Sequence, residues 1–537
     1  MGGEAVRFVG RLLAALILLP AGIAAAAAED FHTPALAVVH VDWRAALDQL
    51  RTELGTAPVV ASNFAFSRGR RVPRFDPRSM PALVQLNGAT SPIFIGITRS
   101  QVPVLLPFDA AAYIGAGLNG EPAAASLSRY QADFAAVDFF DAGPAGYDAV
   151  FSLPPDAGAG LPPRTFARPV EVQITGSLLT YDVADPIGGK GEPVKSLVAQ
   201  YPDLRRFIRE GYVRYAFTRF GVPYVVSIQC LDSVPRVRRL ACREAYPVAE
   251  RFLKALHIAG GLPSQPRTDI APMVAERPSA PSPNFSYRPT GDIIANSGAR
   301  RQGGRADLTA YSQIRFPLEA PAFIHSQSFG KRRSSDKSDQ PSSLYPWRDN
   351  FCEARSFSVG QCASGFGHQG EDIRAGACLP QKQAANACDP KRQPIVAVRD
   401  GIVIRSLKQQ AVTLQINTSN EHIRFRYMHM NPATMDADGL LNGRHVAEGE
   451  KIGVVSNYLD HPNGTSRHLH FDVQVFTRDG WIWVNPYVTL ISAYERLIRG
   501  RGHEIGPEIA AAPDVAHMAP GELVHPDLQE GNENSAN

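Results

Sequence analysis

The sequence predicts a multidomain protein in which an α+β N-terminal region is followed by a mainly antiparallel β domain. Its 537 residues, 44% of them hydrophobic and 20% charged, are too many for one typical hydrophobic core. Helical and strand periodicities are mixed in the first half of the chain, and strand-like runs with turns dominate the second half. A stretch rich in proline and serine separates the two halves.

The chain begins with a segment that is typical of secretory signal peptides. Arg7 and Arg11 precede an apolar run over residues 12–23, and a tract of alanines follows. A transmembrane anchor is the alternative, but Pro20 and the small residues leave this run short of the roughly 20 residues that span a bilayer. We therefore predict a signal peptide over residues 1–28 and an exported protein, periplasmic or secreted, with no stable membrane span after cleavage.

Residues 31–261 are predicted to form an α+β accessory domain, for which no motif indicates a role. Apolar residues recur with helical spacing in some segments and with strand-like patterns in others. The predicted helices are 43–54, 194–210 and 246–258, and the predicted strands are 35–41, 93–98, 170–179 and 213–228.

Three further boundaries follow from composition. Proline and serine recur over residues 262–308 with few large apolar residues, which is typical of a solvated linker. Residues 309–500 return to an apolar pattern and form the second predicted domain. Residues 507–537 carry Glu and Asp but no Lys or Arg, so we expect a disordered acidic tail.

The second domain is predicted to be an antiparallel β domain. Its apolar or alternating runs are separated by turn signals that contain Gly, Asn, Asp and Pro. The predicted strands are an entry strand over 315–317 and 322–324, followed by 395–398, 401–406, 412–416, 422–428, 451–455 and 468–476. The formal net charge of the whole chain, +3, is too small to indicate a nucleic-acid partner.

The six cysteines fall into three pairs that are close in sequence. These pairs are Cys230 with Cys242, Cys352 with Cys362, and Cys378 with Cys388. Export favours disulfides, and the absence of a C-x-x-C spacing argues against a zinc ion held by cysteines. Six cysteines formally allow 15 pairings, and proximity favours the local set.

Five residues of the second domain have side chains suited to zinc chemistry. They are His368, Asp372, His429, His468 and His470. Imidazole nitrogens and carboxylate oxygens both bind Zn²⁺, and three protein ligands leave a fourth position for a catalytic water. Because residues two apart on a strand face the same side, His468 and His470 would reach one site together. Scattered structural histidines are the alternative, which the ordered set disfavours.

Three short segments carry a specific resemblance. In order, they are His368-Gln369-Gly370-Glu371-Asp372, Tyr427-Met428-His429 and His468-Leu469-His470-Phe471. They resemble the H-x-G-x-D, Y-x-H and H-L-H-F elements of the lysostaphin-type zinc endopeptidases, metallopeptidase family twenty-three. The flanks agree with that family over residues 394–398 and 446–453, and the resemblance covers roughly residues 316–490.

The resemblance implies a lysostaphin-type peptidase fold with one Zn²⁺ per chain held by His368, Asp372 and His470. It leaves His429 and His468 as the catalytic groups. The implied activity is that of a zinc metalloendopeptidase, which hydrolyses peptide bonds in peptidoglycan crosslinks or stem peptides by attack of a zinc-bound water. Asp472 shares the ligand face, where it would either orient an imidazole or face solvent.

Two other functions stay open at this point. Some relatives in the family have lost their ligands, so a non-catalytic wall-binding or amidase-activating module is one alternative, which the five intact residues disfavour. A general extracellular protein-degrading metalloprotease is the other, because the same zinc site would serve it. The N-terminal domain, tethered by the predicted linker, is a candidate for intramolecular autoinhibition of the site.

Overall fold

The computed structural model of the protein describes fourteen stretches of the chain. The predicted signal peptide, the predicted acidic tail and the pair Cys378 and Cys388 lie outside them. The described ranges are 35–55, 80–118, 127–135, 139–156, 160–183, 188–230, 240–263, 283–293, 312–324, 346–355, 357–362, 365–375, 393–457 and 467–506.

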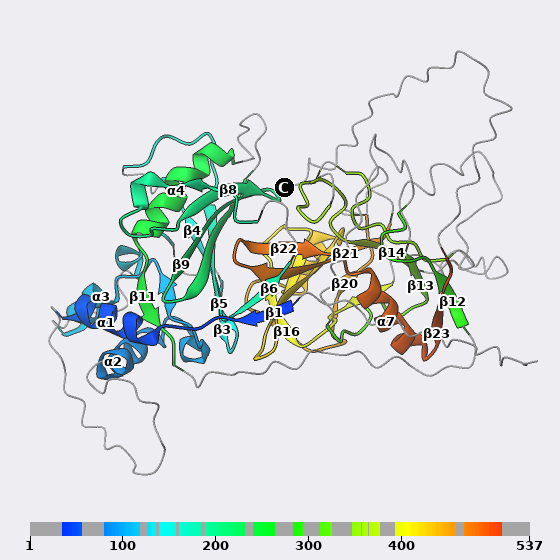
Figure 1. Cartoon of the computed structure of the whole chain (residues 1–537), viewed down its shortest axis with the longest axis horizontal. Coiled ribbons are helices and arrows are strands. Elements are labelled where there is room, and N and C mark those ends of the chain that lie inside the picture. Colours follow the sequence, from blue (N-terminus) through cyan, green and yellow to red (C-terminus); the bar gives the residue numbers. More distant parts are fainter. Residues whose placement is uncertain are drawn as a thin grey trace, which may run out of the picture. The chain divides into compact units, whose positions relative to one another are not determined.

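The N-terminal region is built on a seven-stranded antiparallel sheet (Figure 1). In spatial order its strands are β3 (Phe139–Gly143), β4 (Gly146–Leu153), β5 (Val170–Ser177), β10 (Val222–Gln229), β9 (Tyr212–Arg219), β8 (Arg205–Arg209) and β7 (Glu192–Pro193). Helix α4 (Cys242–Lys254) packs on β5, β9 and β10. Alternate residues of the strands, such as Val172 and Ile174, are fully buried with this helix in one core.

Three more helices complete that core: α1 (Trp43–Leu54), α2 (Met80–Thr90) and α3 (Ala110–Leu118). Helix α1 begins at Asp42, whose carboxylate accepts a hydrogen bond of 3.0 Å from the backbone N–H of Ala45. It buries Trp43, Leu47 and Leu50, which lie on one face because they are three or four residues apart. Two short pairs of strands flank the core: β1 (Ala35–Val38) with β6 (Leu179–Asp182), and β2 (Val104–Leu106) with β11 (His257–Gly260).

Two predicted elements of the N-terminal region are wrong. The predicted helix 194–210 is a 3₁₀ turn, η3 (Lys195–Leu197), followed by strand β8, because Pro202 cannot continue a helix and β8 pairs with β9. The predicted strand 93–98 consists of turns and the 3₁₀ helix η1 (Ile97–Arg99). Gly96 there has a φ of 82°, which ends any extended run.

The second half of the chain forms an eight-stranded antiparallel sheet, as predicted. Its spatial order is β13 (Ala322–Ile324), β14 (Glu371–Ala375), β21 (Leu469–Thr477), β18 (His422–Met428), β17 (Val412–Asn417), β16 (Gly401–Ile404) and β19 (His445–Val446), with β22 (Gly480–Val484) also paired to β21. Strands β15 (Pro394–Val396) and β20 (Lys451–Val454) form a separate pair. Two helices, α6 (Pro432–Ala437) and α7 (Tyr487–Ile498), lie in the same region.

Part of the predicted linker is structured. Strand β12 (Pro283–Tyr287) pairs in parallel with β23 (Arg501–Glu504), which follows α7. The ring of Phe285 packs on Trp347 and Tyr494, with centroid distances of 4.9 and 5.1 Å. Composition alone misses this strand, because its pairing partner lies more than 200 residues away in sequence.

The two faces of the eight-stranded sheet differ in character. Leu469, Phe471 and Val473 of β21 point into an apolar core that includes helix α7. The opposite face is polar and carries His470 and Asp472. At one end of this polar face, N-terminal residues pack directly on the sheet: Val225 joins Phe476 and Trp481 in one buried cluster. The apolar face supports the sheet, and the polar face is divided between chemistry and this internal interface.

A buried polar network holds that interface together. Asp148 of β4 accepts hydrogen bonds from His422, at 2.7 Å, and from Arg424, at 2.9 Å, both on β18. The indole N–H of Trp481 donates to Thr175 Oγ1 at 3.1 Å, and Gln415 donates to Asp141 at 3.0 Å. Burial alone would raise the pKa of Asp148, but His422 and Arg424 lower it below the ordinary value of 3.8. The carboxylate is therefore ionised and paired at neutral pH.

Two of the three predicted disulfides lie within the described residues. The disulfides Cys230–Cys242 and Cys352–Cys362 are both present, which confirms two of the three predicted pairs. Among the described residues, no helix is long and apolar enough to cross a membrane.

The Asp148 network yields a prediction about stability. Replacing Asp148 by Asn leaves the buried Arg424 guanidinium without its counter-charge, so the free energy of unfolding at pH 7 should fall by about 3–5 kcal/mol. Because the folded pKa of Asp148 is lowered, its stabilising contribution is present above the ordinary pKa of 3.8 and is lost as the pH falls. The difference between wild type and Asp148→Asn should therefore narrow below about pH 4.

Denaturant titrations at pH 7 and at several acidic pH values would measure this difference. The exposed Asp156 provides the control, since Asp156→Asn should change little at either pH. A difference between wild type and Asp148→Asn that is small at pH 7, or constant with pH, would contradict the assignment.

Candidate active site

Strand pairing brings the predicted ligands together. In the antiparallel register, Asp372 of β14 lies opposite His470 of β21, and Met428 of β18 lies opposite His470 on the other side. His468 precedes β21 and bridges to Ser456. The two-residue spacing therefore places His468 and His470 on one side of the strand, as expected.

Gly370 allows His368 to approach this strand. A Cβ atom at residue 370 would lie 2.3 Å from the carbonyl oxygen of Phe471, so only glycine fits against the β21 backbone. The backbone between His368 and Asp372 can therefore run close to β21, and this close approach brings the two side chains together beside β21. The glycine of the H-x-G-x-D segment has a steric role here.

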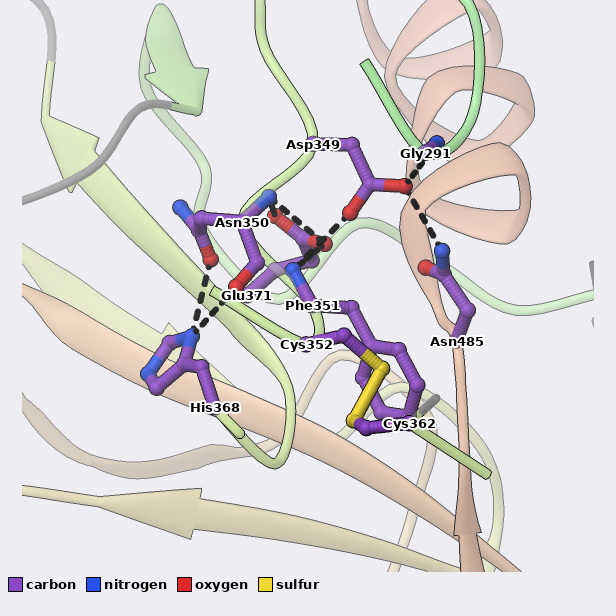
Figure 2. The surroundings of a disulfide bond; sticks show 9 residues. All are labelled: Gly291, Asp349, Asn350, Phe351, Cys352, Cys362, His368, Glu371 and Asn485. Atoms are coloured by element: carbon purple, nitrogen blue, oxygen red, sulfur yellow. Dashed lines mark hydrogen bonds between the residues drawn. A yellow bond between two sulfur atoms is a disulfide. The ribbon is translucent and has the colours of Figure 1, made fainter. Parts of the chain in front are cut away.

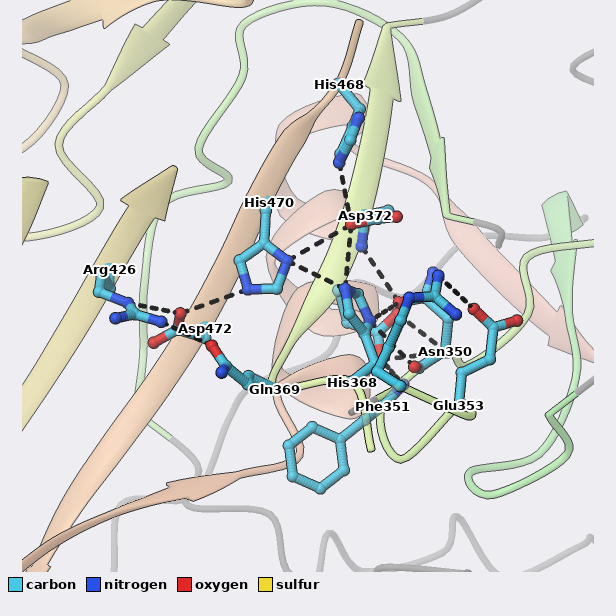
Figure 3. A network of polar contacts seen from close by, with 12 residues as sticks. Asn350, Phe351, Glu353, His368, Gln369, Asp372, Arg426, His468, His470 and Asp472 are labelled. Atoms are coloured by element: carbon cyan, nitrogen blue, oxygen red, sulfur yellow. Dashed lines mark hydrogen bonds and ion pairs between the residues drawn. The ribbon is translucent and has the colours of Figure 1, made fainter. Parts of the chain in front are cut away.

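Three side-chain atoms converge on one buried point (Figure 3). His368 Nε2 lies 3.0 Å from His470 Nδ1, and Asp372 Oδ1 lies 3.3 Å from the former and 3.4 Å from the latter. All three residues are at most 5% exposed. Ligand atoms around a tetrahedral Zn²⁺, with bonds of about 2.0–2.2 Å, lie roughly 3.3–3.6 Å apart, so the observed spacing is close to that of a zinc site.

Polar contacts on the far sides of the two imidazoles favour a metal-binding role for the inner nitrogens. His368 Nδ1 lies 3.0 Å from the carbonyl oxygen and 3.1 Å from the side-chain oxygen of Asn350, which are both acceptors. His470 Nε2 lies 3.3 Å from Asp472 Oδ2. An acceptor beside each outer nitrogen favours a proton there, which leaves the inner nitrogens of both rings able to bind a metal ion.

The loop that carries Asn350 is itself held firmly (Figure 2). Glu371 accepts hydrogen bonds from the backbone N–H groups of Asn350, at 3.2 Å, and Phe351, at 3.1 Å. The disulfide Cys352–Cys362 follows immediately, and the N–H of Cys352 donates to the carbonyl oxygen of His368 at 3.0 Å. This loop therefore fixes both the backbone and the ring of the first ligand.

Two carboxyl groups are buried together beneath that loop. Burial and the neighbouring Asp349 raise the pKa of Glu371 well above its ordinary value, and burial also raises the pKa of Asp349. Asp349 accepts further hydrogen bonds from the N–H of Gly291 and from Asn485, both at 2.7 Å. The residues adjoining the predicted metal ligands His368 and Asp372 are thus tied into the core.

The sequence left two roles open for Asp472: orienting an imidazole or facing solvent. Because Asp472 is fully buried, the solvent-facing role is wrong, and its contacts favour the orienting role. Its carboxylate accepts hydrogen bonds from Arg426, at 2.8 Å, and from the indole of Trp483, at 3.1 Å. Burial would raise the pKa of Asp472, but Arg426 and His470 lower it. An ionised Asp472 therefore stands behind His470.

The two predicted catalytic histidines lie beside this centre. His468 Nε2 is 3.2 Å from Asp372 Oδ1, and its ring centroid is 4.7 Å from that of His429. His429 directly follows strand β18 and has a φ of 68°, a left-handed conformation that is uncommon for residues other than glycine. Its ring lies 5.9 Å from that of His470. The structure thus brings all five predicted residues together.

The buried negative charge of Asp372 favours the binding of a cation at this centre. Burial would raise the pKa of Asp372, but His468 and His368 hold it well below the ordinary value of 3.8. Neither oxygen of this buried carboxylate has a hydrogen-bond partner of good geometry among the described residues. A buried carboxylate is costly unless a positive charge lies beside it, and a bound metal ion would supply that charge. The donor set of two nitrogens and one carboxylate oxygen fits Zn²⁺.

Sequence reasoning missed Asn350 and Arg426. Asn350 lies 18 residues before His368 in a segment that has no recognisable motif. Arg426 lies two residues before Met428 on β18, so both side chains point to the same face of the sheet. This spacing is the signal in the sequence that could have placed Arg426 on the face of the predicted ligands.

The role of Asn350 can be tested through metal affinity. Asn350→Ala removes one of the two oxygens that orient the His368 ring, so the dissociation constant for Zn²⁺ should rise roughly 10- to 100-fold. Competition with a chromophoric chelator would measure it. Asn420→Ala, in the turn between β17 and β18, is the matched control and should bind as wild type does. Equal zinc affinity in Asn350→Ala and wild type would remove the positioning role.

Comparisons with known proteins agree with the geometry over part of the chain. Residues 383–485 match the model of peptidase family M23. This segment contains His429, His468 and His470, while His368 and Asp372 precede it. No curated protein matches the chain.

One solved structure, of a protein assigned as the glycyl-glycine endopeptidase LytM from Ruminococcus gnavus ATCC 29149, is similar at 16% identity and a TM-score of 0.21. The match covers 37% of this chain and 65% of that one, so the chain spans less than two thirds of that protein. The family model therefore carries the comparison: residues 383–485 are similar to peptidase family M23.

Proposed function

We propose that residues 309–500 form a zinc-dependent endopeptidase that hydrolyses peptide bonds in peptidoglycan crosslinks or stem peptides. The observation that carries this proposal is the buried convergence of His368 Nε2, Asp372 Oδ1 and His470 Nδ1, with the outer nitrogens of both rings held by acceptors. The peptidase family match and the intact set of five residues support hydrolysis over a non-catalytic wall-binding or activating role.

His368, Asp372 and His470 would hold one Zn²⁺, which supplies Lewis acidity and lowers the pKa of a coordinated water to about 7. His429 and His468 lie beside these ligands and would serve as a proton acceptor and an oxyanion donor. One imidazole would take a proton during attack on the peptide carbonyl, and the other would donate a hydrogen bond to the carbonyl oxygen as negative charge develops there. Asp372 and the ring of His429 fix the orientation of His468.

We also propose an exported protein of the cell envelope, periplasmic or secreted. The two described disulfides, Cys230–Cys242 and Cys352–Cys362, support an oxidising compartment. Peptidoglycan lies in that same compartment, so substrate and enzyme would meet there.

Digestion of purified sacculi tests the activity. The full chain loaded with zinc should release fragments that carry new peptide termini, identified by mass spectrometry, and a chelator should abolish this release. Casein degraded as fast as sacculi would favour a general protease. Intact sacculi after prolonged incubation with zinc-loaded protein would contradict the proposed function.

Three substitutions separate metal binding from catalysis. His470→Ala should lose both zinc and hydrolysis, because it removes a ligand. His429→Ala and His468→Ala should retain zinc but lose about 10²–10⁴-fold in turnover, the usual contribution of a positioned acid or base. Zinc content by elemental analysis and release of sacculus fragments provide the two measurements.

The control for these three variants is His445→Ala, since His445 is an exposed histidine on β19 of the same sheet. It should match wild type in both measurements. Zinc content that is unchanged in a folded His470→Ala variant would disprove the ligand set, and near-normal turnover in both other variants would disprove their roles.

A further inference from the structure

A polar pocket of about 130 Å³ lies between the N-terminal sheet and the eight-stranded sheet. Strands β5 and β10 line one side, and strands β16 to β18, with the loop between β16 and β17, line the other. The residues that matter for its chemistry are Glu171, Gln173, Gln229, Gln410, Arg426 and Met428. No step of the proposed reaction uses this pocket.

The floor of the pocket continues the face that carries the zinc ligands. Met428 lies directly opposite His470 in the antiparallel register, and Arg426 lies opposite Asp472. Residues directly opposite each other in such a pair point to the same face. Thr413 of β17, opposite Arg426, extends this surface by one more strand. A substrate held over the zinc ligands would therefore reach the pocket by crossing from β21 to β18 and β17.

The wall of the pocket comes from the N-terminal sheet. Gln173 pairs with Val150 on one side and Ser227 on the other, so its side chain shares a face with Thr175, two residues along β5. Thr175 is buried at the interface, where it binds Trp481. Ser406 also donates a hydrogen bond of 3.0 Å to Glu171 across the two sheets. The same contacts that join the sheets thus hold the wall in place.

The chemistry of the pocket favours amide groups. Gln173, Gln229 and Gln410 each offer one hydrogen-bond donor group and one acceptor, as a peptide bond does. The side-chain oxygen of Gln410 is buried and has no hydrogen-bond partner among the described residues. Such an acceptor is costly to leave unsatisfied, and a small rotation of the Gln410 side chain would turn it towards an N–H of a ligand in the pocket. The charge of Arg426 is already matched by Asp472, which disfavours an anion.

We propose that this pocket is a substrate subsite that binds one residue of the peptide beside the scissile bond through amide hydrogen bonds. The N-terminal region then selects the substrate directly, because Gln173 and Gln229 belong to it. The volume suits a single residue, since it is well below the roughly 300 Å³ at which pockets for larger ligands begin. This inference rests on the proposed function and deepens it.

Binding of peptidoglycan fragments tests the subsite without relying on turnover. The probe is a disaccharide-tetrapeptide prepared from purified sacculi, titrated calorimetrically into the full chain, with the disaccharide alone as the second probe. Gln410→Ala and the double variant Gln173→Ala with Gln229→Ala change the pocket from opposite sides. Gln200→Ala, an exposed glutamine of the N-terminal region outside the pocket, is the matched control.

Both pocket changes should weaken binding of the disaccharide-tetrapeptide by roughly three- to tenfold, because each lost hydrogen bond between neutral groups contributes a factor of that order. Gln200→Ala should bind as wild type does, and the disaccharide should be unaffected throughout. Unchanged tetrapeptide binding in both pocket variants, or an equal loss with the disaccharide, would overturn the subsite while wild type still digests sacculi. A wild-type protein that neither binds fragments nor digests sacculi would overturn the proposed function as well.

Discussion

The candidate site depends on one electrostatic constraint, the burial of the Asp372 carboxylate beside two imidazoles. Its Oδ1 atom and the inner nitrogens of both rings lie within 3.4 Å of one another, and the buried negative charge needs a positive charge beside it, which a bound cation would supply. The surrounding structure maintains this arrangement, because Asn350 and Asp472 hold the far nitrogens of the rings and prevent them from turning away. The fold thus holds together three side chains that could bind one metal ion.

That constraint is satisfied by strand register. Pairing of β14 with β21 sets Asp372 beside His470, and close approach at Gly370 lets His368 join them. The same polar face continues across β18 and ends in the Asp148 network with the N-terminal sheet. One face therefore serves metal binding at one end and internal packing at the other, and the pocket between them is bounded by both halves of the chain.

The sequence predicted the parts that follow from short-range pattern. The two-residue period placed His468 and His470 on one face, and helix α1 matches its predicted range because its capping residue and apolar spacing are local signals. Long-range contacts were not predictable in this way. Strand β8 forms where a helix was expected because β9 supplies its hydrogen bonds, and nothing near Asn350 in sequence indicates that it will meet His368. The packing of Asp148 on His422 joins residues 274 positions apart.

The coordination of zinc in the purified full-length protein shows whether His368, Asp372 and His470 hold the metal ion. X-ray absorption at the zinc edge should show one ion per chain with only nitrogen and oxygen ligands at about 2.0–2.2 Å, and the scattering pattern of two imidazoles. Sulfur scattering near 2.3 Å, an all-oxygen shell without imidazole, or no bound zinc would contradict the account.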